Sequence, residues 1–114
     1  MKNYTWYRGV ATHMWRTYFA LERDGFEWEK LSVPNQRMYA ICNHVFLKRF
    51  GKTDQDILKT YFASRWGDDI YTVENYSAKH NIPVKVVWMV IHRANREVMI
   101  YAGFLERKEN DDDE

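Results

Sequence analysis

Large apolar side chains recur every three or four residues along most of this chain, and glycine or proline residues separate one such run from the next. Spacings of three and four bring side chains to one face of an α-helix, whereas a half-buried strand requires strict alternation. The first run covers residues 5–24 and ends before Gly25, a natural helix stop. Its apolar positions are Trp6, Val10, Met14, Tyr18 and Leu21, with Tyr7, Trp15 and Phe19 widening the apolar surface. The pattern predicts an all-α fold.

Two more helices are predicted in the middle of the chain. Pro34 suits the first turn of a second helix, which ends before Gly51. Thr53 is placed to cap a third helix, with Asp56 in the first turn, where a negative charge is favourable. The sequence Trp66-Gly67-Asp68-Asp69 is expected to end this third helix.

The last third of the chain predicts two further helices, which makes about five in all. Thr72 is placed to cap a fourth helix over residues 73–80. The sequence Asn81-Ile82-Pro83 forms a turn, and a fifth helix follows over residues 84–102, with Gly103 as its stop.

The fifth segment also permits a different fold. Val84–Ile91 is rich in β-branched residues, so a hairpin at residues 84–104 would give an α+β fold. Residues 93–97 contain no glycine or proline to make a tight hairpin turn, which favours the helix. A helix also places these apolar residues on one face: Val87, Val90, Ile91, Ala94, Val98 and Tyr101.

Residues 72–91 have the layout of a DNA-reading helix-turn-helix. Such a unit needs a small residue where two short helices touch and a turn residue that tolerates positive φ. Ser77 or Ala78 supplies the small residue, and Asn81 supplies the turn residue because asparagine tolerates the left-handed conformation. The expected inward anchors are Val73, Tyr76, Ile82, Val87 and Ile91, with His80 closing the first helix.

The stretch from Asp54 to Met99 resembles region 4 of bacterial sigma factors and the small phage-encoded regulators of the RinA and ArpU groups. The resemblance lies in Ile57–Phe62, the spacer with Gly67-Asp68, residues 72–91, and Val87–Ala94. In that family the equivalent segments are a support helix, a loop and the helix-turn-helix that grips DNA. The resemblance leaves out residues 1–50. It implies a non-enzymatic transcription regulator of phage or mobile-element type that binds double-stranded DNA.

Seven side chains are the predicted DNA contacts: Lys79, Val84, Lys85, Trp88, Met89, Arg93 and Arg96. Lys85 and the start of the fifth helix are expected at the bases, and the other three basic residues at phosphates. This surface departs from the family, which usually places Arg, Lys, Ser and Thr there. Trp88 in particular is bulky for a groove, and burial under the N-terminal helices is the commoner fate of such a ring.

An apolar outer face on the fifth helix equally suits docking onto another protein. RNA polymerase or a phage assembly protein would be a partner of this kind. The alternative function is therefore a non-enzymatic protein-interaction module with a helix-turn-helix shape. The aromatic residues between positions 6 and 28 also predict a homodimer, which would suit a two-fold DNA site.

Length and charge predict one helical domain over residues 1–108, with an N-terminal part at 1–52 and the helix-turn-helix part at 53–105. Residues 109–114 contain five acids and no base, and such a segment is expected to be a disordered acidic tail. Without it, 17 bases face 11 acids, so the net charge of +1 becomes +6. A positive body is compatible with nucleic acid.

Several classes of protein are not favoured by the sequence. No apolar run approaches the length that spans a bilayer, and the single cysteine, Cys42, forms no internal disulfide, which fits a cytoplasmic protein. The four histidines are scattered without a zinc-binding spacing, and Asp68 and Asp69 read as turn residues. We therefore expect no metal, no cofactor and no enzymatic activity.

Overall fold

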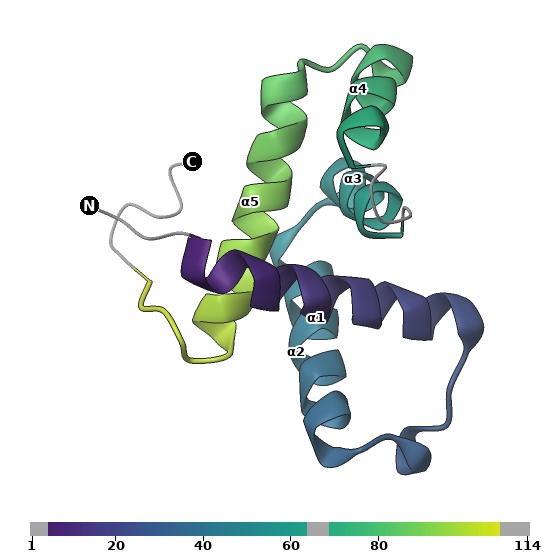
Figure 1. Cartoon of the computed structure of the whole chain (residues 1–114), viewed down its shortest axis with the longest axis vertical. Helices are drawn as coiled ribbons and strands as arrows, with labels where there is room; N and C mark the ends of the chain where they lie inside the picture. Colours follow the sequence, from purple (N-terminus) through teal and green to yellow (C-terminus); the bar gives the residue numbers. More distant parts are fainter. Residues whose placement is uncertain (1–4, 64–68, 108–114) are drawn as a thin grey trace.

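The computed structural model describes residues 5–63 and 69–107 (Figure 1). Its elements are α1 (Thr5–Asp24), the 3₁₀ turn η1 (Trp28–Lys30), α2 (Val33–Arg49), α3 (Lys52–Phe62), α4 (Asp69–His80) and α5 (Val84–Tyr101). Within the described residues there are five α-helices and no strand. The all-α prediction is confirmed. The alternative hairpin is wrong, because residues 84–101 form one continuous helix.

Helix α5 is the centre of the fold, since it packs against each of the other four α-helices. Helix α1 crosses its C-terminal half, and α3 and α4 lie beside its N-terminal half (Figure 1). The C-terminal half is therefore enclosed, and Ala94 and Val98 have no exposed surface. The N-terminal half keeps one side open to solvent.

The N-terminal half of the chain contributes an aromatic core. Trp15 is fully buried, and the rings of Phe19 and Phe62 stack on it at centroid distances of 5.9 Å. Its indole N–H donates to the backbone oxygen of Ala94 in α5 at 3.1 Å. Burial of large rings removes much apolar surface from water, so this cluster explains the high aromatic content of the chain.

The buried face of α1 differs from the predicted one. The buried side chains are Tyr7, Ala11, Trp15, Tyr18 and Phe19. Val10 is 50% exposed, although its spacing of three and four residues from other apolar positions predicted that it would lie on the buried face. Helix α1 is apolar on two sides, and the larger rings take the buried side because they remove more surface from water.

Two predicted helix caps are wrong. Helix α3 begins at Lys52 with Gly51 as its N-cap, so Thr53 lies inside the first turn. The side-chain amide of Gln55 joins the first turn of α3 to the end of α2, because it donates to the carbonyl oxygens of Phe46 (3.0 Å) and Phe50 (2.9 Å). Thr72 also lies inside a helix, because α4 begins at Asp69.

Other local predictions are confirmed. Gly25 has a φ of 80° directly after α1, a conformation that glycine adopts without strain. Pro34 lies in the first turn of α2, where the hydroxyl of Ser32 accepts a hydrogen bond from the Asn35 N–H. Cys42 is buried, and burial raises the pKa of its thiol. Most of the predicted break at residues 66–69 and the acidic tail at 109–114 lie outside the described residues. None of the helices described is both long enough and apolar enough to cross a bilayer.

Candidate nucleic-acid interface

A three-residue turn joins α4 to α5, and Asn81 adopts the left-handed conformation there with a φ of 56°, as predicted. The Ile82 N–H donates to the Ser77 carbonyl at 3.0 Å, the six-to-one bond of a Schellman motif. The Ser77 hydroxyl donates to the Ile82 carbonyl. Ser77 is half-buried and Ala78 is exposed, so Ser77 is the small residue at this contact.

The predicted inward anchors are confirmed. Val73, Tyr76, Val87 and Ile91 are buried, and Ile82 is half-buried against the core. Tyr76 also joins α4 to α3, because its hydroxyl donates to Asp56 Oδ2 at 2.6 Å. Burial and this hydrogen bond raise the pKa of Tyr76 to about 12, so the hydroxyl keeps its proton at neutral pH. The turn and both helices are thus fixed against α3.

The solvent-facing side of the first turns of α5 is mostly apolar. Val84, Val86 and Met89 are exposed, Met89 by 47%. Lys85 is exposed beside them, and Lys79 is exposed in the last turn of α4. The α4–α5 turn forms one end of the long axis of the molecule (Figure 1). Five of the seven predicted contact residues lie at or near it: Lys79, Val84, Lys85, Trp88 and Met89.

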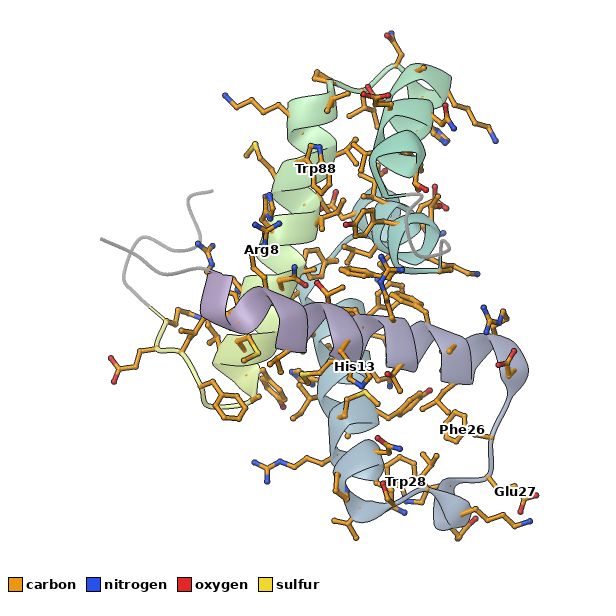
Figure 2. The ribbon with its side chains drawn as sticks, viewed as in Figure 1. Arg8, His13, Phe26, Glu27, Trp28 and Trp88 are labelled. Carbon is orange, nitrogen blue, oxygen red and sulfur yellow. The ribbon has the colours of Figure 1, made fainter. Side chains whose placement is uncertain are left out.

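Trp88 lies at the edge of this surface (Figure 2). It is half-buried, its ring meets Tyr61 of α3 edge-on at a centroid distance of 5.7 Å, and His92 stacks on it at 5.7 Å. Trp88 therefore contacts the core through α3. The expectation that it packs under the N-terminal helices is wrong, because α5 turns this face toward α3.

Arg93 is already engaged within the chain. Its Nη2 donates to the Arg49 carbonyl at 3.0 Å, and its guanidinium lies 4.7 Å from the ring centroid of Phe50. Its Nη1 is 3.9 Å from Asp54 Oδ2. Arg93 is half-buried in this position. A phosphate would have to compete with these contacts, so Arg93 is a weaker candidate for phosphate binding than the exposed lysines.

Arg93 and Arg96 share a pocket of about 590 Å³ between α1, α5 and the start of α3. Arg8 of α1 and His92 also line it, and Val86 and Met89 contribute to its apolar part. Figure 2 shows Arg8 over α5, between α1 and Trp88. Loss of solvent around its ring and the nearby charge of Arg8 lower the pKa of His92. Three arginines and one acid, Asp54, line this pocket beside its apolar residues.

Sequence reasoning missed Arg8. It lies more than 80 residues before its pocket neighbours Arg93 and Arg96, in a helix that the sigma-like resemblance does not cover. Only the crossing of α1 over α5 brings it there, and no local spacing signals that crossing. The predicted contacts thus form two groups, one at the turn and one in the pocket, and Met89 belongs to both.

The aromatic residues expected at a dimer contact are mostly used within the chain. Trp15, Tyr18 and Phe19 are buried in the core. Phe26 and Trp28 stay partly exposed at the end of the molecule opposite the α4–α5 turn, where both rings contact Tyr39 (Figure 2). The homodimer stays a prediction.

Across residues 5–63 and 69–107, no three His, Cys, Asp or Glu side chains come together as metal ligands. Comparison of the chain with protein-family models, curated proteins and solved structures finds no match. The resemblance to sigma region 4 therefore stays a prediction.

Proposed function

We propose that this chain binds double-stranded DNA through α4, the turn at Asn81 and the leading end of α5, as a transcription regulator of phage or mobile-element type. The observation that supports this most is the position of α5. Its C-terminal half is enclosed by other helices, and its N-terminal half presents an exposed side beyond a tight turn. A recognition helix in a major groove requires such an arrangement.

The side chains at this end of the molecule are suited to binding the phosphate backbone of DNA, with few contacts to the bases. Lys79 and Lys85 are exposed cations on the two sides of the turn. Each can neutralise a phosphate, and phosphate contacts fix the orientation of a protein on the duplex. Val84 and Met89 can contact thymine methyl groups. We therefore expect salt-dependent binding with modest sequence preference.

The test is fluorescence anisotropy with a labelled random-sequence duplex, with Lys79→Gln/Lys85→Gln compared with the parent chain. Loss of one phosphate contact per lysine is expected to weaken binding about tenfold or more at low salt. Lys30→Gln is the matched control, because Lys30 is an exposed lysine in η1, at the other end of the molecule. Equal binding by the double variant and the parent would exclude this end as the DNA interface.

A second candidate function rests on the same surface. Val84, Val86 and Met89 are exposed apolar side chains in the first turns of α5, which favours docking onto a protein such as RNA polymerase or a phage assembly protein. Apolar docking is only weakly sensitive to salt, whereas phosphate binding weakens steeply as salt rises. Val86→Ser/Met89→Ser would abolish protein docking while leaving the salt-dependent DNA component in place.

A further inference from the structure

The pocket between α1, α5 and the start of α3 has a volume of about 590 Å³, which is within the range of small-molecule sites. Three apolar side chains of α5 line one part of it: Val86, Met89 and Val90. Val86 and Met89 are exposed, and Val90 is buried. Small-molecule sites combine such an apolar wall with a few polar groups that fix the orientation of the ligand.

Asn95 supplies one polar group to the wall. It lines the pocket and is only 4% exposed. Among the described residues, its buried Oδ1 has no hydrogen-bond partner. Buried acceptors in folded proteins are nearly always paired, because an unpaired one has lost its water without gaining a donor. An N–H or O–H group of a bound molecule would supply the missing donor.

Arg8 supplies a positive charge from α1. It is exposed and lies over α5 (Figure 2). Within residues 5–63 and 69–107, no hydrogen bond or ion pair holds its guanidinium. Arg93 and Arg96 also line the pocket, but both already have interactions within the chain. Arg8 is therefore the arginine available to a carboxylate, which a guanidinium binds through two parallel N–H bonds.

The other titratable groups that line the pocket leave room for an anion beside Arg8. Asp54 is the one acid, and its Oδ2 lies 3.9 Å from Arg93 Nη1, so its charge is already partnered. The pKa of His92 is lowered by loss of solvent and by the charge of Arg8, so its ring is neutral at neutral pH.

We propose that this pocket binds a small apolar carboxylic acid that also carries an N–H or O–H group. The carboxylate pairs with Arg8, and the N–H or O–H group donates to Oδ1 of Asn95. The apolar body of the ligand packs against the α5 side chains named above. Because Arg8 belongs to α1 and Asn95 to α5, the ligand joins the two helices.

An NMR titration of the full chain with indole-3-acetate tests the site, because this probe has a carboxylate, an apolar ring system and one N–H group. We expect saturable shifts of the Asn95 side-chain amide and the His92 ring signals at millimolar probe. We also expect the probe to raise the pKa of His92, because a bound carboxylate offsets the charge of Arg8.

Two analogues each remove one polar group from the probe. Indole-3-acetamide has no negative charge and should bind about fivefold more weakly, as expected for loss of a solvent-exposed ion pair. The N-methyl form of indole-3-acetate has no N–H group and should also bind about fivefold more weakly, as expected for loss of one hydrogen bond.

Each analogue has a matched variant of the chain. Arg8→Gln should remove the preference for the acetate over the acetamide. Arg37→Gln, which replaces an exposed arginine of α2, should keep that preference. Asn95→Leu removes the unpaired acceptor at similar side-chain volume, so it should remove the preference for the N–H form over the N-methyl form.

Three results would each overturn the site. The probe causes no saturable shift at Asn95 and His92, its shifts are confined to the exposed rings of Phe26 and Trp28, or the preference for the acetate persists in Arg8→Gln. If Asn95→Leu fails to fold, the Arg8→Gln comparison decides, because Arg8 is exposed and its replacement leaves the core unchanged.

Discussion

Arg107 donates hydrogen bonds to both carboxylate oxygens of Glu97, one to Oε2 at 2.9 Å and one to Oε1 at 2.5 Å. Arg49 of α2 donates to Oε1 from its Nε at 3.1 Å. The Glu97 side chain is only 2% exposed, and both arginines are about one-third exposed. A buried acid in α5 thus holds both α2 and the end of the described chain.

We predict that Glu97→Gln lowers the free energy of unfolding at neutral pH by about 2 kcal/mol, because two arginines lose their charged partner. Urea unfolding measures this free energy. Glu106→Gln is the control, because Glu106 is an exposed acid next to Arg107. A loss no larger than that of the control would show that the ion pairs contribute nothing net.

The pH dependence of stability gives a second prediction about Glu97. Burial by itself raises the pKa of a carboxyl group, but hydrogen bonds and charges from Arg107 and Arg49 outweigh it and hold the pKa of Glu97 below its usual range. The stabilisation is therefore present above the unfolded pKa and is lost as pH falls through the folded pKa. As pH falls below about 5, the stability of the parent should fall more steeply than that of Glu97→Gln.

A third prediction concerns the turn at Asn81. Asn81→Val should lower the free energy of unfolding by about 1–2 kcal/mol, because a β-branched residue is strained at positive φ. Asn81→Gly removes the same side chain without strain, so its stability should stay within about 0.5 kcal/mol of the parent. If valine and glycine have the same effect in urea unfolding, the left-handed turn is not a constraint in solution.

The periodicity of the sequence was sufficient to predict five helices and the left-handed Asn81, because both depend on local spacing and local backbone preference. It was not sufficient to choose the buried side of α1. Val10 and Trp15 both have helical spacing, and only packing against Phe62 and Ala94 selects Trp15. The start of α3 also depends on packing: its N-cap is Gly51 rather than Thr53. The Gln55 side chain ties this start to the end of α2 and the connection after it, where its two acceptors lie.

The pocket between α1 and α5 was even harder to predict from the sequence than the buried side of α1. Arg93 and Arg96 were predicted as phosphate contacts from their place in α5, but their environment depends on residues from distant segments. Arg8 comes from α1 and Asp54 from α3. Charge spacing within one helix cannot reveal a pocket whose wall is built by three helices.

A fourth prediction tests the link between α1 and α5. Trp15→Phe should lower the free energy of unfolding by about 2 kcal/mol, because it removes the hydrogen bond to Ala94 and leaves a cavity in the core. Trp28→Phe, at a partly exposed ring, should change stability by less than about 0.5 kcal/mol. Similar losses for the two variants would contradict the central position of Trp15.

A fifth prediction concerns His92 and Arg8. Loss of solvent around the imidazole and the charge of Arg8 lower the pKa of His92, so Arg8→Gln should raise this pKa toward the usual range. An NMR titration of the ring protons measures it. Arg37→Gln, which removes an exposed arginine of α2, should leave the titration of His92 unchanged. If Arg8→Gln leaves the pKa of His92 unchanged, Arg8 does not lie close to His92 in solution.

The most direct test of the DNA-binding proposal is the salt dependence of duplex affinity. The logarithm of the binding constant should fall linearly with the logarithm of salt concentration, and Lys79→Gln/Lys85→Gln should make the slope shallower by about 2, one unit for each lost phosphate contact. A parent chain that binds no duplex at low salt, or a slope that the two substitutions leave unchanged, would contradict the assignment of the α4–α5 end as a DNA interface.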